Sequence, residues 1–383
     1  MLGSREGSGE GVTLPRLAIL TPNSLSAHMI LRDLLRVLGS SHRDGRNLTE
    51  EESYSAFASI LSGSESEIQV GAFLIALRWK GVTVEELTGF ARAARAAANI
   101  PCVGMAGMVC VCPPHDGLEE HPPLEVAAGL IAAAAGARVM LITDTGVPPK
   151  RGLTAANVLN HLGAGLTWDP REVEDWVLKA RFGAIAVPGM MPSILGLRRV
   201  RGEIGVRTPL STIEKLLAPS TASVLVGAQA GPVLGMAVEV LQALGHPHGI
   251  AVQGVGGGVI PTVKRRSRAI ELEGPHIAPL TVEPADFGLD CPNDDDLPMY
   301  MPADDGQGTG DNPALVKKSG EATLAVLAGE LGPARNAALL GAALMLKSAG
   351  RCMTLAEGVD AAISALDSGE ATQVLARLRS LVG

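Results

Sequence analysis

The chain has 383 residues, of which 46% are hydrophobic and only 3% aromatic, and its formal charge at pH 7 is −8. This apolar content excludes an intrinsically disordered chain, and the length allows about two domains that each bury a core. The acidic balance argues against a general nucleic-acid coat, which needs surplus cations and aromatic rings. The core is therefore aliphatic, and function is expected in loops and charged residues.

Cysteine content and hydropathy predict a soluble, cytoplasmic protein. The five cysteines are odd in number and sparse for the length, which is typical of a reducing compartment. Residues 1–20 show no secretory signal. The uncharged stretch 216–238 is interrupted by proline, glycine and polar residues, which is atypical of a membrane-spanning helix.

The N-terminal part predicts a flexible tail, residues 1–23, followed by a small helical unit that ends near residue 98. Thr49 followed by Glu52 predicts a capping box at the start of a helix. An apolar stripe on the next helix recurs at spacings of four, three and four residues. It consists of Ile68, Ala72, Ile75 and Trp79.

Short β-rich runs that alternate with helical segments follow, and they predict a mostly parallel sheet with helices on both faces. The runs are Val139–Thr143, Ala184–Val187, Ser223–Gly227 and Gly249–Gln253. Residues 191–217 are helical and basic, and we expect them to return to the helical unit. Residues 290–319 are acidic and predicted to be a loop, after which four helices are expected, including 333–348 and 355–366.

These patterns predict an α/β protein with a small all-helical N-terminal domain and a large domain around a mostly parallel sheet. The helical domain would combine residues 24–98 with 188–216. The α/β domain would combine residues 99–187 with 217–383.

Two loops are candidate ligand sites, one because it enters a predicted helix and the other because it directly follows a predicted strand. The first, residues 112–117, enters a helix predicted over 124–135, whose free amides favour anions; the alternative is an ordinary Asp-Gly turn. The second, residues 143–152, offers Lys150 for a phosphate or carboxylate and Asp144 for hydroxyl groups. The alternative for this loop is a solvated turn.

A third candidate is a group of arginines around the predicted helix near residue 200, with Glu214 close in sequence. Arginine forks match carboxylate and phosphate geometry, although a solvated helix face explains such charges equally well. Arg201 and Arg207 are retained because both flank a Gly-Val turn.

Two further motifs give weaker signals. The glycine run 254–258 lacks the spacing of known nucleotide loops, and the basic run 264–268 is either a phosphate contact or exposed charge. The spacing of the nearby cysteines and histidines does not match common zinc sites, so no metal site is predicted. These residues are Cys110, Cys112, His115 and His121.

Several longer segments point to a known family. They are LEVAAGLIAAAAGARV, VRGEIGVRTPL, VEPADFGL and the C-terminal GPARNAALLGAALMLKSAGRCMTLAEGVDAAISALDSGEA. In these segments the chain resembles the anthranilate phosphoribosyltransferase family of glycosyltransferases, over about residues 30–383. The resemblance implies that family's fold, a relation to tryptophan biosynthesis, a homodimer through the helical domain, and a site for a sugar phosphate and an acceptor between the domains.

The family's ligand motifs are altered in this chain. CPPHDG replaces the glycine-rich loop GTGGDG, and only Asp116 and Gly117 survive. Glu125 lies where the family has a phosphate-binding turn, and 141–145 replaces a basic strand end. The pair Asp-Glu that holds magnesium is replaced near residues 258–261. The resemblance thus implies magnesium as a cofactor while its usual ligands are missing, and the cofactor is left open.

Other positions match the family. Arg201 falls where the family contacts the carboxylate of its acceptor, and Arg207 and Lys150 are also retained. The resemblance assigns Asp116, Asp144 and Lys150 to a donor side and the two arginines to an acceptor side. The full set of predicted substrate-binding residues, with no catalytic residue assigned, is Asp116, Gly117, Glu125, Asp144, Thr145, Lys150, Arg201, Arg207 and Glu214.

Two functions follow as hypotheses. The first is a divergent enzyme that moves a pentosyl or phosphopentosyl group to a small nitrogenous acceptor. The second is a protein of the same fold that binds a ligand or nucleic acid without catalysis. The acidic balance weakens the nucleic-acid version.

Overall fold

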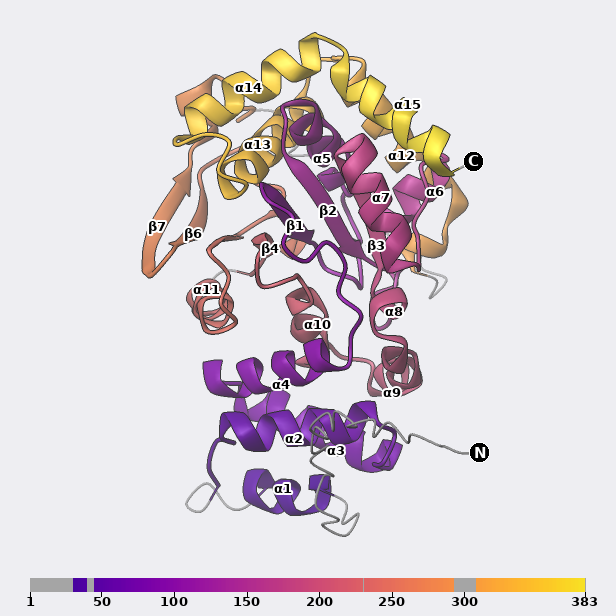
Figure 1. Cartoon of the computed structure of the whole chain (residues 1–383), viewed down its shortest axis with the longest axis vertical. Helices are drawn as coiled ribbons and strands as arrows, with labels where there is room; N and C mark the ends of the chain where they lie inside the picture. Colours follow the sequence, from indigo (N-terminus) through magenta and orange to yellow (C-terminus); the bar gives the residue numbers. More distant parts are fainter. Residues whose placement is uncertain (1–29, 40–44, 230, 293–307, 383) are drawn as a thin grey trace, which may run out of the picture.

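The structure is a computed structural model that describes residues 30–39, 45–229, 231–292 and 308–382 (Figure 1). The predicted tail, residues 1–23, lies outside the described residues. The N-terminal helical unit lies at one end of the molecule. It consists of α1 (Ile30–Gly39), α2 (Glu50–Leu61), α3 (Glu67–Lys80) and α4 (Val84–Ala96).

The starts of three of these helices are fixed by local side-chain bonds. The predicted capping box at Thr49 and Glu52 is confirmed at the start of α2. α3 and α4 begin with equivalent boxes, at Ser66 and Thr83. A cap of this kind stabilises a helix by about 1 kcal/mol, because it satisfies amide groups that have no partner within the helix.

The predicted apolar stripe on α3 forms one face of the helix, but that face points outward. Ile68 and Trp79 are 86% and 88% exposed, and Ile75 is also exposed. The opposite side of α3 packs into the helical unit through Val70, Phe73, Leu74 and Leu77. Phe73 meets the ring of Phe90 on α4 edge-on.

A seven-stranded sheet forms the centre of the larger domain, in the order β3-β2-β1-β4-β5-β6-β7. Its strands are β1 (Met108–Cys112), β2 (Arg138–Thr143), β3 (Phe182–Ala186), β4 (Ser223–Gly227), β5 (His248–Val252), β6 (Ser267–Glu273) and β7 (His276–Val282). The first five strands pair in parallel, and β6 and β7 add antiparallel at one edge. The predicted α/β fold class is therefore confirmed.

The four predicted strands are confirmed to within two residues, whereas the β6–β7 hairpin was not predicted from the sequence. Most of β7 is exposed and β6 is only partly buried, so neither has the continuous apolar run of the inner strands. The basic run 264–268, whose cationic side chains are exposed, leads into β6.

Side chains of the inner strands point alternately into two hydrophobic cores, one on each face of the sheet. Val109 and Val111 of β1 belong to the core on one face, together with α5 (Glu125–Ala134) and α13 (Pro333–Ser348). Cys110 and Cys112 point to the other face, whose core continues through α11 (Val233–Ala243) into the helical unit. The period of two along each strand produces this division.

Further helices cover the sheet and carry the C-terminus along the far end of the molecule (Figure 1). They are α6 (Ala155–His161), α7 (Pro170–Ala180), α12 (Pro313–Leu327), α14 (Leu355–Asp367) and α15 (Glu370–Val382). The four predicted C-terminal helices are thus present, but the loop predicted to residue 319 is wrong from residue 313 onward. The sequence signal for the start of α12 was Asn312 at the N-cap position, followed by proline in the first turn.

Residues 187–216 cross from the sheet back to the helical unit, as predicted. They form α8 (Val187–Met190), α9 (Leu197–Ile204) and α10 (Leu210–Ile213), with one short 3-10 turn before α9 and another after α10. α9 packs on α3, and α10 packs on α4. The predicted domain bounds themselves stay a prediction.

In the described part of the chain, every helix is too short or too polar to cross a bilayer.

Candidate functional site

The candidate site lies where β1, β2 and β4 end at one edge of the sheet. The loops that follow these strands meet the crossing segment 197–216, which comes from the side of the helical unit (Figure 1). In open parallel sheets, ligands bind at the carboxyl ends of the strands. The geometry of this edge, called the polar edge below, is set by a series of buried polar contacts.

Asp116, in the loop after β1, is fully buried and paired with Arg207. The Nη2 atom of Arg207 lies 2.7 Å from Oδ1 of Asp116. The second oxygen, Oδ2, and the Nε atom of Arg207 have no hydrogen-bond partner among the described residues. This pair therefore keeps one buried acceptor and one buried donor unused.

Arg201 on α9 and Glu214 form a second buried pair. The Nη1 atom of Arg201 lies 2.6 Å from both carboxylate oxygens of Glu214, and its Nη2 atom donates to Ser211 at 2.9 Å. Burial opposes ionisation of Glu214, but the positive charge of Arg201 outweighs it. The pKa of Glu214 is consequently lowered to about 2.

Asp144, directly after β2, pairs with Arg198 on α9. Its Oδ1 atom also accepts from the backbone N–H of Thr145 at 2.8 Å. Burial raises the pKa of Asp144 above its usual value, and the charge of Arg198 opposes that rise. Asp144 therefore ties the end of β2 to the crossing segment.

His115 lies between these pairs and is itself buried. Its Nε2 atom lies 2.9 Å from the carbonyl oxygen of Ile142, so Nε2 carries a proton, because a carbonyl can only accept. Its Nδ1 atom faces Glu214 at 3.5 Å. The imidazole thus bridges the β2 end and the Arg201–Glu214 pair.

Lys215 points its ammonium group at the end of β4. The Nζ atom donates to the carbonyl oxygen of Gly227 at 2.7 Å, and the side chain is only partly buried. Burial, with the nearby charge of Arg207, lowers the pKa of Lys215 to about 8. Among the described residues no carboxylate lies within ion-pair distance of this lysine.

Five of the predicted site residues meet at this edge: Asp116, Asp144, Arg201, Arg207 and Glu214. Gly117 follows Asp116 in the same loop. Thr145 is exposed beside Asp144. Their roles toward a substrate stay predictions.

The other two predicted residues have different surroundings. Lys150 pairs with Glu119 at 2.8 Å near the surface. Glu125 is buried in the first turn of α5, where burial raises its pKa to about 7. Neither forms a hydrogen bond or an ion pair with the residues of the three buried pairs in the described part of the chain.

Sequence reasoning missed three residues of this edge as site residues. Arg198 belongs to the predicted arginine group but not to its retained members. His115 lies within the candidate loop 112–117 and was considered as a zinc ligand, but it was not among the predicted binding residues. Lys215 follows Glu214 directly, so the charged dipeptide within an apolar stretch was the available signal.

The residues at this edge do not fit a magnesium ion. Asp116, Asp144 and Glu214 each face a guanidinium group, which competes for their oxygens. Residues 258–261 supply no carboxylate. In the described ranges no three potential ligands of the His, Cys, Asp or Glu type are grouped to hold a metal.

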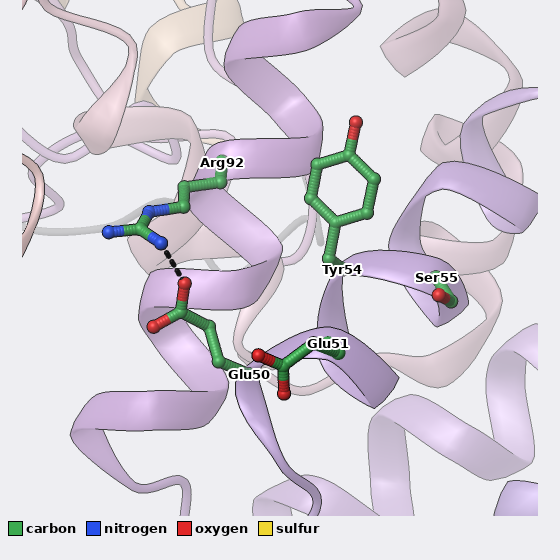
Figure 2. A pocket seen from close by; sticks show the side chains of 5 residues that line it. All are labelled: Glu50, Glu51, Tyr54, Ser55 and Arg92. Atoms are coloured by element: carbon green, nitrogen blue, oxygen red, sulfur yellow. Dashed lines mark hydrogen bonds and ion pairs between the residues drawn. The ribbon is translucent and has the colours of Figure 1, made fainter. Parts of the chain in front are cut away.

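A separate pocket of about 410 Å³ lies at the helical unit, lined by residues of α2 and α4 (Figure 2). It is lined by Glu50, Glu51, Tyr54, Ser55 and Arg92, and Glu50 and Arg92 form an ion pair across it. None of the predicted site residues lines this pocket.

Comparison with known proteins identifies the family. The helical bundle domain of a glycosyl transferase family matches residues 40–98, and the a/b domain of that family matches residues 124–372. Anthranilate phosphoribosyltransferases of Symbiobacterium thermophilum and Geobacter sulfurreducens are both 31% identical to this chain. Each match spans 88% of this chain, with 94% and 95% of the relatives covered.

Solved structures agree on the fold. The crystal structure of anthranilate phosphoribosyltransferase from Thermus thermophilus matches with a TM-score of 0.75 at 24% identity, covering 93% of this chain and 99% of that one. The Saccharomyces cerevisiae enzyme in complex with PRPP and Mg matches with a TM-score of 0.73 at 16% identity and the same coverage. The chain therefore belongs to the glycosyl transferase family that includes the anthranilate phosphoribosyltransferases.

Proposed function

We propose that this protein transfers a pentosyl or phosphopentosyl group to a small nitrogenous acceptor. The observation that carries the proposal is the polar edge of the sheet, where buried Asp116, Asp144 and His115 face the crossing segment. Membership of a transferase family supports it. We also propose that the protein acts in the cytoplasm, which is the localisation that the family implies.

The proposed reaction is a displacement at the anomeric carbon of the sugar. The bond from that carbon to the leaving oxygen breaks, the bond to the acceptor nitrogen forms, and the acceptor loses a proton. The transition state has oxocarbenium character, so buried carboxylates near the sugar stabilise the developing positive charge. The unused Oδ2 atom of Asp116 is suited to that role or to accepting from a sugar hydroxyl. The remaining contribution is positioning.

A thermal-shift panel tests the proposal with ribose 1-phosphate, ribose 5-phosphate and phosphoribosyl pyrophosphate, each with and without magnesium. Binding to the folded state raises the midpoint by mass action, so a saturating ligand stabilises by about 3 kcal/mol. Ligands that raise the melting midpoint are then incubated with nitrogenous acceptors, and transfer is followed by mass spectrometry. Absence of any shift at about 10 mM ligand would overturn the proposal.

Anthranilate is one acceptor within this class, and growth distinguishes it. Expression of the chain in a tryptophan auxotroph that lacks anthranilate phosphoribosyltransferase would restore growth only if this protein performs the same transfer. We expect no rescue, because Glu214 already occupies Arg201, the residue that the resemblance assigns to the acceptor carboxylate.

A second candidate function is binding without catalysis. It is favoured by one observation: Arg198, Arg201 and Arg207, the arginines that the crossing segment directs at the polar edge, are already paired with carboxylates of the same chain. Titration with a labelled oligonucleotide at two salt concentrations separates a nucleic-acid binder from the enzyme. Salt-dependent binding at micromolar protein would support the binder.

We also propose a homodimer through the helical unit. The outward stripe of α3, with Ile68, Ile75 and Trp79, is an apolar face that water would otherwise cover. A second copy of the chain presents the same face, so a two-fold axis beside α3 would bury both.

A further inference from the structure

We infer that Lys215 binds a single phosphate group of the ligand at the carboxyl ends of β1 and β4, and that this edge does not accept a diphosphate. The inference deepens the proposed function and rests on it only for the pentose part of the ligand. It follows from the charges of the polar edge, from the position of Lys215, and from the polar atoms left unused nearby.

Most positive charges of the polar edge are neutralised by carboxylates of the same chain. Arg198, Arg201 and Arg207 are each neutralised by one carboxylate of this chain, in two cases at 2.6–2.7 Å. The charge of each of these guanidinium groups is therefore already balanced. Among the described residues at the carboxyl ends of β1, β2 and β4, Arg151 and Lys215 have no carboxylate partner. Arg151 is exposed in the loop after β2, whereas Lys215 is partly buried beside Arg207 and Asp116. A diphosphate carries several negative charges, and the buried part of this edge offers only the unpaired charge of Lys215, among the described residues, to oppose them.

Lys215 has a fixed position at the end of β4. Lys215 is held by the carbonyl oxygen of Gly227, the last residue of β4. The backbone of the glycine run 254–258 packs closely here, because a side chain on Gly227 would come within 2.6 Å of two of its carbonyl oxygens. The ammonium is thus anchored to rigid backbone while solvent still reaches the side chain. Two of its three donors remain for a ligand.

The surroundings of Lys215 include polar atoms that make no hydrogen bond among the described residues. Two residues whose charges act on Lys215 carry buried polar atoms without partners, Oδ2 of Asp116 and Nε of Arg207. Thr208, next to Arg207 in the chain, carries a third, its Oγ1. A buried polar atom that makes no hydrogen bond destabilises the folded protein, so such a cluster indicates a missing partner. A sugar with hydroxyl groups supplies donors and acceptors for these atoms, and its phosphate reaches Lys215. An ammonium ion is a compact point charge that suits a tetrahedral phosphate.

Isothermal titration of the full chain tests the inference, with inorganic phosphate, ribose 5-phosphate and phosphoribosyl pyrophosphate as probes. Wild type is expected to bind phosphate and ribose 5-phosphate, and to bind the diphosphate no more tightly, with or without magnesium. Lys215→Met is expected to weaken binding of both monophosphates at least about tenfold, and Lys215→Arg to retain part of it. Circular dichroism and thermal melts establish that each variant is folded.

The matched control is Lys179→Met. Lys179 lies on α7 just before β3, hence at the opposite edge of the sheet, and it is exposed beside Asp175. This variant removes the same charge and is expected to leave phosphate binding unchanged. Equal weakening in both variants would mean that only overall charge matters, and it would overturn the inference.

Sulfate provides a pH test, because its own charge is constant between about pH 7 and pH 9.5. The groups around Lys215 are Arg207, Asp116, Glu214 and the thiol of Cys112. Since the pKa of Lys215 is about 8, sulfate binding is expected to fall as the pH rises through that value. The Lys215→Arg variant is expected to lose this pH dependence.

The outcomes separate the two proposals. Phosphate binding that depends on Lys215, without any transfer activity, would support the inference and count against the proposed enzyme. Transfer by a Lys215→Met variant at the wild-type rate and affinity would support the enzyme and overturn the inference. Tighter binding of the diphosphate than of ribose 5-phosphate, or no binding of phosphate at about 10 mM, would also overturn it.

Discussion

At the scale of single residues, the polar edge is defined by carboxylates whose ionisation is set by burial and by their partners. Glu214 in this edge and Glu125 in α5 are both buried, yet their pKa values shift in opposite directions. Arg201 keeps Glu214 charged, whereas Glu125 has no cation paired with it among the described residues. The two glutamates therefore predict opposite dependences of stability on pH.

Replacement of Glu214 is expected to destabilise the protein strongly. Glu214→Gln leaves the buried charge of Arg201 without its partner, which costs about 3–5 kcal/mol of the free energy of unfolding. Urea denaturation at neutral pH measures this loss. Glu203→Gln on the exposed face of α9 is the control, and its effect is expected to stay within about 0.5 kcal/mol.

The same pair predicts a loss of stability in acid. The pKa of Glu214 is about 2 in the folded protein and near 4.5 when unfolded, so its contribution is complete above 4.5. That contribution declines as the pH falls from 4.5 toward 2. In Glu214→Gln the decline over this window should be smaller than in wild type, and an unchanged acid profile would contradict the assignment.

Glu125 predicts the reverse behaviour. Its pKa is about 7 when folded and near 4.5 when unfolded, so the folded state holds the extra proton and stability falls as the pH rises across this window. Glu125→Gln keeps a neutral side chain. The variant should therefore gain stability relative to wild type between pH 4.5 and 7, by on the order of 3 kcal/mol at most.

Urea titrations of wild type and Glu125→Gln at about pH 5 and pH 8 measure this difference. Glu120→Gln, an exposed neighbour in the preceding loop, serves as the control. A difference between Glu125→Gln and wild type that is equal at both pH values would show that Glu125 does not change its ionisation on folding.

At the scale of elements, the loop after β1 depends on a glycine. Gly117 has a φ of +78°, and a Cβ atom there would lie 2.3–2.4 Å from the backbone of Gly152. The two loops of the candidate site are therefore in direct backbone contact. That contact also includes the bridge between Leu118 and Leu153.

Gly117→Ala is expected to cost several kcal/mol. The left-handed backbone costs about 1–2 kcal/mol for a residue with a side chain, and the clash with Gly152 adds about 1–3 kcal/mol. Gly63→Ala is the matched control, because its φ is +72° and a Cβ atom there would meet no other atom within 4 Å. Denaturation of both variants separates the clash from the strain, and equal losses would contradict the close packing of the loops.

At the scale of the whole molecule, the outward stripe of α3 predicts assembly. Wild type is expected to sediment with twice the chain mass, because the stripe of Ile68, Ile75 and Trp79 is covered by a second copy. Trp79→Glu places a charge in that face and should yield monomers in analytical ultracentrifugation.

The control for assembly is Leu331→Glu. Leu331 is 87% exposed, like Trp79, but it lies in the chain between α12 and α13. Both of these helices belong to the larger domain, away from the helical unit (Figure 1). This variant is expected to sediment as wild type does. A wild-type monomer at micromolar concentration would refute the proposed dimer.

Local signals in the sequence accounted for much of the fold. The capping box at Thr49 and the inner strands depend on residues a few positions apart, so their patterns can be recognised from the sequence alone. The β6–β7 hairpin was not predicted from the sequence because its faces are half exposed and its strands lack a continuous apolar run. The start of α12 at Pro313 was missed although its N-cap signal was present.

The sequence by itself determined which residues are candidates for the site, because charge type and loop position already single out Asp116, Asp144, Arg201, Arg207 and Glu214. Only the tertiary structure decided their partners. Asp116 and Arg207 are 91 positions apart, and Asp144 and Arg198 are 54 apart. Periodicity carries no information over such separations. An ion pair depends on distances that the whole sheet and the crossing segment set together. Among the described residues, these distances leave Lys215 as a partly buried cation without a carboxylate at the polar edge.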